Sequence, residues 1–196
     1  MASHSVRPPR LPRVIDEFAE TAVCYNLSFS SPTLDSIRHM SIRPYRPQDL
    51  DRLKQITAIC FDGVSIDRNI EARFGPINGQ DWRFRKLRHI DADVAGENAP
   101  GVFVFEAEDG NVVGYITTRL DRDSGIGWIP NLAVDPGQQG AGVGRQLMEH
   151  ALAYMREEGM EAAKIETLQQ NDVGSNFYPS VGFEEVGLQI HYLMRL

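Results

Sequence analysis

Residues 132–148, LAVDPGQQGAGVGRQLM, constrain the fold of this chain more than any other segment. An apolar run ends at Val134, an Asp-Pro pair turns the chain, and glycines at every second position from Gly140 lead into an amphipathic helix. Glycine permits positive φ and a close backbone approach to a ligand, and the free N–H groups of a helix start favour an anion. The segment therefore predicts a strand, a turn and a helix whose N-terminus can hold a pyrophosphate.

Two common phosphate-binding motifs do not fit this segment. A P-loop requires Gly-Lys followed by Ser or Thr at the helix entry, whereas Gly144 is followed here by Arg145 and Gln146. A dinucleotide fingerprint requires G-x-G-x-x-G, but Gly144 comes one residue too early after Gly140 and Gly142. These residues alone leave several families of nucleotide-binding proteins open.

Hydrophobic periodicity places the other expected elements around this segment. Apolar residues spaced by three and four predict helices that begin at Asp49, over residues 81–94 and over residues 142–158. Alternating patterns predict strands at residues 42–43, 101–107, 112–120, 127–134, 164–168, 184–186 and 188–196. A loop-rich stretch is expected over 61–80, a short helix or turn over 175–181, and a bulge at Pro130, which has no N–H for a ladder. This order predicts an α+β fold with a single mixed, mostly antiparallel sheet flanked by helices.

Composition bounds the domain organisation and the partners. With 196 residues, 42% of them apolar, the chain favours one domain, and its net charge of −7 disfavours a nucleic-acid partner. Residues 1–39 carry four basic and four acidic side chains, so we expect an N-terminal extension, either flexible or not native, ahead of a domain over 40–196 that carries the whole net charge. No membrane span, signal peptide or metal spacing is visible, so we expect a cytoplasmic protein without a membrane or metal partner.

Two motifs together resemble the GNAT N-acetyltransferase superfamily. The run Gln139-Gly140-Ala141-Gly142-Val143-Gly144 matches the acyl-CoA-binding motif Q/R-x-x-G-x-G/A, and residues 171–183 have the spacing of N…A…(F/L)Y-x-x-x-GF. The resemblance covers residues 42–196 and is weak over 61–100. It implies the acyl-CoA N-acyltransferase fold, acetyl-CoA as co-substrate, and transfer of an acetyl group to a primary amine by direct attack in a ternary complex. The acceptor would be a small molecule or a peptide N-terminus.

The same resemblance implies roles for individual residues. The strand end would pair with pantetheine, the glycine loop would wrap the pyrophosphate, and Tyr178 would protonate the leaving thiolate as general acid. The implied acetyl-CoA-binding residues are Leu132, Ala133, Val134, Gln139, Gly140, Ala141, Gly142, Val143, Gly144, Arg145, Asn171 and Tyr178. The sequence departs from the family pattern at three points: Gln139 replaces the commoner Arg, Gly174 stands where Ala is usual, and Pro179 follows Tyr178.

Several interpretations stay open at this point. Glu166 has the spacing of the general base in the branch that acetylates ribosomal-protein N-termini, but a paired surface carboxylate explains it equally well; Asp121, Asp123 and Glu106 are weaker candidates. Trp128 either lines the acceptor cleft or fills the core. The basic residues of 81–94 form a solvated face or contact an anionic ligand, and the apolar residues 188–196 could pair across a homodimer. The alternative functions are a catalytically silent acyl-CoA-binding or sensing module and a nucleotide- or phosphate-binding protein.

Overall fold

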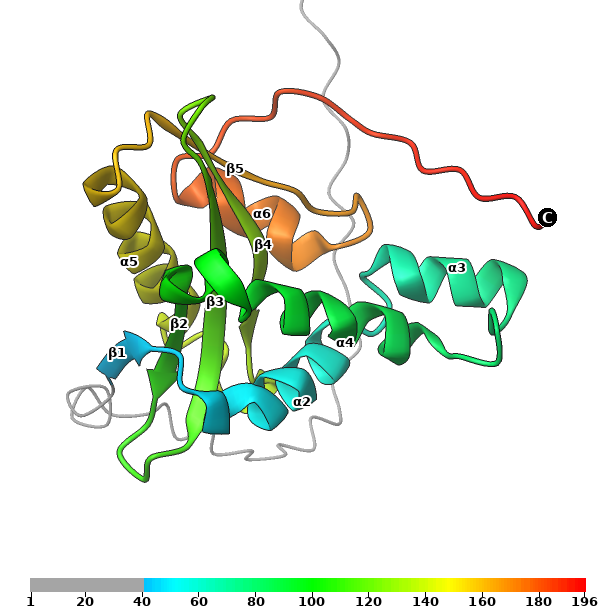
Figure 1. Ribbon diagram of the computed structural model, residues 1–196, viewed down its shortest axis with the longest axis horizontal. Helices are drawn as coiled ribbons and strands as arrows, with labels where there is room; N and C mark the ends of the chain where they lie inside the picture. The colour runs from blue at the N-terminus through cyan, green and yellow to red at the C-terminus, as the bar shows by residue number, and fades with distance from the viewer. Residues whose placement is uncertain (1–40) are drawn as a thin grey trace, which may run out of the picture. The chain divides into compact units, whose positions relative to one another are not determined.

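The computed structural model describes residues 41–196, which form one five-stranded sheet with helices on both faces (Figure 1). The strands lie in chain order: β1 (Ser41–Pro44), β2 (Val102–Glu106), β3 (Val112–Asp121), β4 (Ile126–Val134) and β5 (Ala162–Ile165). The first four are antiparallel neighbours and β5 runs parallel to β4. The single mixed, mostly antiparallel sheet is therefore confirmed, and the expected extension over 1–39 lies outside the described residues.

The described residues form five α-helices and three short 3₁₀ helices. The α-helices are α2 (Leu50–Cys60), α3 (Ile66–Phe74), α4 (Trp82–Asp93), α5 (Val143–Glu157) and α6 (Asp172–Ser180). Three short 3₁₀ helices are η1 (Pro47–Asp49), η2 (Gly96–Gly101) and η3 (Pro136–Gln138). Asp81 caps α4 by accepting a hydrogen bond from the Phe84 N–H. The helices expected from periodicity are confirmed to within a residue or two.

The sheet buries two apolar layers, one on each face. Along β2, Phe103 and Phe105 pack with α5 and α6, whereas Val102 and Val104 pack with α2 and α4. This alternation follows from the two-residue period of a strand, which sends successive side chains to opposite faces. We call these two sides the α5 face and the α2 face.

Two irregularities open the sheet around β4. Thr117 pairs with Asn131 and Arg119 pairs with Trp128, so two residues of β4, including Pro130, oppose one residue of β3. This is the bulge that Pro130 predicts. The pairing of β4 with β5 stops at Ile129, so the rest of β4 has no partner on that side among residues 41–196.

Three sequence expectations differ from the structure. The stretch 61–80 contains helix α3, in which Ile66, Ile70 and Phe74 recur every four residues but none is fully buried. Strand β5 ends at Ile165, upstream of the expected 164–168. The expected strands over 184–186 and 188–196 are wrong. After α6 this segment is extended and runs clear of the sheet (Figure 1), and it pairs with no strand in the described structure.

Candidate functional site

The glycine loop between β4 and α5 has the backbone that an anion site needs. Gly140 and Gly142 adopt φ of 81° and 82°, and Gly142 is the N-cap of α5 in the left-handed conformation. No side chain caps this helix, so its first N–H groups stay available to a ligand. At Gly140 nothing lies within 4 Å of an added Cβ, which means that conformation rather than crowding requires glycine there.

Side chains from α2 hold the end of β4 in front of this loop. Arg52 donates to the Val112 carbonyl at 2.9 Å and to the Asp135 carboxylate at 2.5 Å. The Cys60 thiol donates to the Val134 carbonyl at 3.2 Å, and burial raises the pKa of this thiol to about 11, so it keeps its proton. These contacts fix the point at which the strand enters the glycine loop.

Two residues of the motif make contacts that sequence reasoning did not foresee. Gln139 turns its side chain back and donates to the Val134 carbonyl at 3.0 Å. Arg145, in the first turn of α5, donates to the carbonyl and hydroxyl of Ser180 at the end of α6, at 3.3 and 3.2 Å. The loop is thereby connected to both β4 and α6.

Helix α6 brings the second motif beside the first. Asn171 caps the helix by accepting from the Gly174 N–H at 3.2 Å and donates to the Thr167 hydroxyl at 2.9 Å. A Cβ at Gly174 would lie 2.7 Å from both of those side chains, so the departure from the usual Ala has a steric reason.

The general-acid candidate Tyr178 is largely buried on the α5 face. Its ring makes edge-to-face contacts with Phe177 and Phe183, at centroid distances of 5.7 and 6.3 Å. Burial raises the pKa of Tyr178 to about 12, and its hydroxyl has no hydrogen-bond partner within residues 41–196. The phenol is therefore protonated at neutral pH and able to donate.

The general-base candidate Glu166 lies just past the end of β5. Its carboxylate forms an ion pair of 3.4 Å with Lys164, and both side chains are more than half exposed. Lys164 in turn lies 5.2 Å from the Trp128 ring centroid, which places Glu166 on the Trp128 side of β5. The carboxylate is therefore paired at the surface, and its partner Lys164 lines a pocket.

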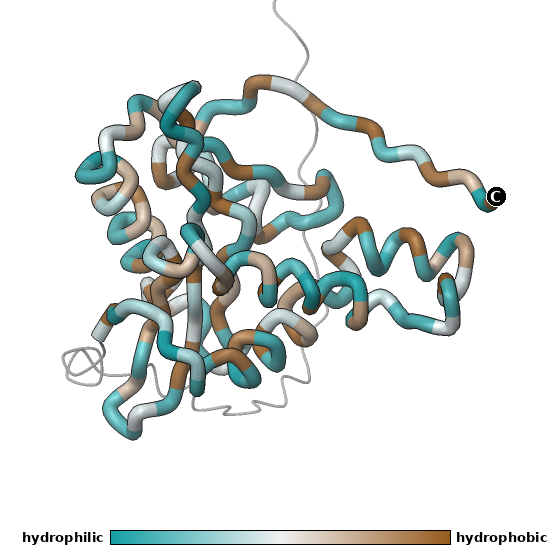
Figure 2. Tube along the Cα trace, in the orientation of Figure 1, coloured by the Kyte–Doolittle hydropathy of each residue, from teal (hydrophilic) through white to brown (hydrophobic). Residues whose placement is uncertain are grey.

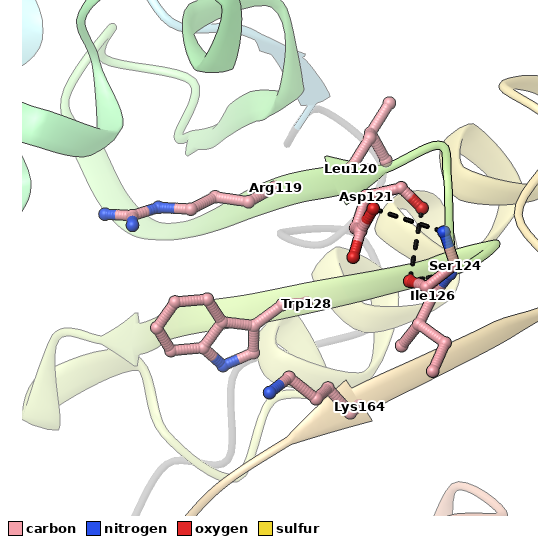
Figure 3. Close-up of a pocket in the computed structure, with 7 residues that line it drawn as sticks. All are labelled: Arg119, Leu120, Asp121, Ser124, Ile126, Trp128 and Lys164. Atoms are coloured by element: carbon pink, nitrogen blue, oxygen red, sulfur yellow. Dashed lines mark hydrogen bonds between the residues drawn. The ribbon is translucent and has the colours of Figure 1, made fainter.

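That pocket has a volume of about 300 Å³ and lies over β3, β4 and β5 (Figure 3). Trp128 stands in it between Arg119 and Lys164, each 5.2 Å from the ring centroid. Its buried indole N–H has no partner in the described part of the chain. Trp128 is therefore a pocket residue, not a core residue. Asp121 also lines the pocket, and hydrogen bonds from Ser124 lower its pKa, which makes it a poor base.

A buried polar cluster on the α2 face was missed by the sequence reasoning. Asp93 is fully buried and accepts hydrogen bonds from Thr117 at 2.9 Å, Arg119 at 2.6 Å and Asn131 at 2.7 Å. Lys86 donates to the Asn131 side chain at 2.8 Å, and burial lowers the pKa of Lys86 to about 8. We call these five residues the Asp93 cluster. These residues lie in α4, β3 and β4, so no pattern within a short stretch of the sequence predicts the cluster.

Comparison with known proteins identifies the family. A model described as "Acetyltransferase (GNAT) family" matches residues 68–183, and the chain belongs to this family. A mycothiol acetyltransferase from Propionibacterium freudenreichii is 33% identical over 155 residues, which cover 76% of this chain and 44% of the relative. N-alpha-acetyltransferase RimI from Mycobacterium tuberculosis is 35% identical over 92 residues, covering 46% of this chain and 56% of that protein. The chain spans about half the length of these two relatives.

A solved structure shares the fold. A GNAT family acetyltransferase from Brucella melitensis, in complex with acetyl-CoA, superposes with a TM-score of 0.55 at 25% identity, over 75% of this chain and 84% of that one. Across residues 41–196, no helix combines the length and apolar character needed to cross a bilayer.

Proposed function

We propose that this chain transfers an acetyl group from acetyl-CoA to a primary amine by direct attack within a ternary complex. One observation carries the proposal. The part of β4 that no longer pairs with β5 leads directly to the uncapped N-terminus of α5, where Gly142 is the left-handed N-cap. An uncapped helix N-terminus favours a phosphate, and the unpaired strand offers backbone groups to an extended ligand arm. Family membership supports the same assignment.

The cofactor-binding residues would act mainly through their backbone. The main chain of Leu132, Ala133 and Val134 would pair with the pantetheine arm, and residues 139–145 would surround the pyrophosphate. Gln139 and Arg145 already bond to Val134 and Ser180, so backbone N–H groups carry most of the anion binding. Asn171 would contact the same arm from the start of α6.

Two side chains would move the protons. Acetyl-CoA, when bound, would supply an acetyl group that its thioester activates for attack by the amine. Glu166, directly or through water, would take a proton from the acceptor amine, whose nitrogen then forms the new N–C bond as the C–S bond breaks. Tyr178 would donate its proton to the departing sulfur, and its pKa of about 12 keeps that proton in place at neutral pH.

The Trp128 pocket is the proposed acceptor side. Asp121, Arg119 and Lys164 line it, and Glu166 forms an ion pair of 3.4 Å with Lys164. The acceptor would be a small amine or a peptide N-terminus, the latter in keeping with the name of the RimI relative. We further propose that residues 40–196 form the acetyltransferase domain, that the protein acts in the cytoplasm, and that it works as a homodimer.

Initial-rate kinetics with acetyl-CoA and a panel of amines test the proposal. The panel should hold an aminoglycoside, a peptide with a free N-terminus and a simple alkylamine, each with free CoA as the readout. We expect intersecting lines in double-reciprocal plots, and a fall in kcat of about 100-fold or more for Tyr178→Phe, with an unchanged Kd for acetyl-CoA.

The matched control is Tyr154→Phe, because Tyr154 is a half-buried tyrosine of α5 whose ring packs on Phe103. It should leave kcat unchanged. Binding of acetyl-CoA without turnover on any amine would instead support an acyl-CoA-sensing module. Tight ATP binding without acetyl-CoA binding would contradict both assignments.

A further inference from the structure

Lys86 in α4 carries a charge that the fold leaves without a counterion. Its ammonium donates to the Asn131 side-chain carbonyl at 2.8 Å and lies 3.9 Å from the centroid of the Phe61 ring. Figure 2 shows α4 as a mostly hydrophilic helix, yet Lys86 is half-buried and forms no ion pair within residues 41–196. Lysines that leave the solvent are normally paired with a carboxylate. An unpaired lysine in this position is therefore a candidate for binding a ligand.

The two carboxylates that act on Lys86 from a distance have closer partners. Asp93 accepts from the Arg119 guanidinium at 2.6 Å, and Asp67 forms an ion pair of 3.4 Å with Arg85. The Asp93 cluster thus holds two cations, Lys86 and Arg119, against one carboxylate. An excess of one positive charge lies beneath the bulge of β4, and an anion would offset it.

Lys86 reaches β4 at the point where the edge of that strand becomes free. Strand β5 pairs with β4 only as far as Ile129, and Lys86 bonds to Asn131, which is two residues further along. With the pyrophosphate at the glycine loop beyond β4, the pantetheine arm would run back from Val134 to Leu132. Its thioester end would then lie toward Asn131, so Lys86 is placed beside the reacting end of the arm.

We propose that the acceptor is a small amine that also carries a carboxylate or phosphate group, and that Lys86 binds this anionic group. The inference rests on the proposed function and makes its substrate class specific. An ammonium has three N–H donors and the Asn131 bond uses one, so donors remain for an anionic oxygen. Arg119 belongs to the same cluster and also lines the Trp128 pocket, which connects the proposed anion site to the proposed acceptor side.

Binding of an anion at Lys86 should depend on pH. The ammonium attracts the anion and the neutral amine does not, and burial lowers the pKa of Lys86 to about 8. Asp67 and Asp93 favour the charged form, but their effect is smaller than that of burial. The preference for an anionic acceptor should therefore be present near pH 7 and decline as the pH rises through 8.

Two matched pairs of acceptors test the proposal with the full chain and acetyl-CoA. β-Alanine is compared with β-alaninamide, and phosphoethanolamine with ethanolamine, each by kcat/KM from CoA release. The measured quantity is the ratio of the anionic to the neutral member in the wild type, divided by the same ratio in Lys86→Met, which cancels the intrinsic reactivity of the amines. We expect a value of about ten or more for at least one pair near neutral pH. The pair with the larger value assigns the group as a carboxylate or a phosphate.

The matched control is Lys54→Met, because Lys54 is a half-buried lysine of α2 that is paired with Asp91. It should leave both ratios unchanged, and the Kd for acetyl-CoA should be unchanged in both variants. Raising the pH from about 7 to about 9 should lower the ratio in the wild type but not in Lys86→Met. Equal ratios in the wild type and Lys86→Met, for both pairs, would overturn the proposal.

Calorimetric titration of the same amines into protein saturated with CoA separates this inference from the proposed function. Binding of an anionic member that Lys86→Met abolishes, without turnover of any amine, would refute the proposed function and keep the anion site. Turnover with the same preference in the wild type and Lys86→Met would refute the anion site alone. An absence of both binding and turnover for the anionic members would overturn the anion site.

Discussion

The two faces of the sheet are built from different kinds of contact. On the α5 face, the glycine loop and α6 present backbone N–H groups, a capping Asn171 and one buried phenol, Tyr178. On the α2 face, the Asp93 cluster joins charged and polar side chains under the bulge of β4. A ligand that is the same in every reaction cycle suits a fixed backbone site, whereas side chains on the other face can vary with the acceptor.

This difference implies that the two faces should respond differently to mutation. Changes in the Asp93 cluster leave buried polar groups without partners, so they should lower stability first. Changes in the glycine loop alter the backbone conformation of one site, so they should lower acetyl-CoA affinity first.

The largest effect is expected for Asp93→Ala. The substitution leaves the Arg119 charge and the amide of Asn131 without their buried partner, which should lower the free energy of unfolding by about 3 kcal/mol. Urea denaturation followed by circular dichroism measures it. Asp91→Ala removes a half-exposed carboxylate of the same helix, paired with Lys54, and should cost less than about 1 kcal/mol. Equal losses of unfolding free energy in the two variants would mean that the Asp93 cluster stabilises the α2 face no more than a surface ion pair does.

A smaller, pH-dependent effect is expected at Lys86. Its pKa is lowered from 10.5 to about 8 in the fold, so between these values the unfolded chain binds more protons. The penalty of burying the charge is therefore fully present below pH 8 and disappears as the pH rises toward 10.5. The stability of Lys86→Met relative to wild type should accordingly fall by about 2–3 kcal/mol between pH 7.5 and pH 10.5.

Denaturation series at several pH values measure this slope. Lys54→Met is the control, because Lys54 forms its ion pair with the half-exposed Asp91. A stability difference for Lys86→Met that does not change with pH would mean that the ammonium is not desolvated at Asn131.

The smallest effect is expected for Gly142→Val on the α5 face. A non-glycine residue at a φ of 82° is strained by roughly 1–2 kcal/mol, which should raise the Kd for acetyl-CoA about tenfold. Calorimetric titration with acetyl-CoA gives the value. Gly144→Ala should bind normally, because its Cβ would meet Val134 and Phe177 at ordinary contact distances of 3.8 and 3.9 Å. Weaker binding by Gly144→Ala alone would show that crowding, not backbone conformation, governs the loop.

The sequence predicts the α5 face well because its signals are local. The glycines of 140–144, the stripe of α5 and the missing N–H of Pro130 each act within a few residues of themselves. The Asp93 cluster could not be predicted, because Asp93 meets Thr117 and Asn131 only through the register of β3 with β4. Residues 184–196 show a third case: their alternation predicts strands, but in the described structure they pair with no strand.

The most direct test of the central claim follows the acetyl group itself. The protein is incubated with acetyl-CoA labelled in the acetyl carbons and with each amine of the panel, and the acceptor is analysed by mass spectrometry while free thiol is counted. The account predicts that label reaches the nitrogen of at least one amine in the same molar amount as the CoA released, and that Tyr178→Phe slows both together. Acetyl-CoA that binds but stays intact with every amine would contradict it.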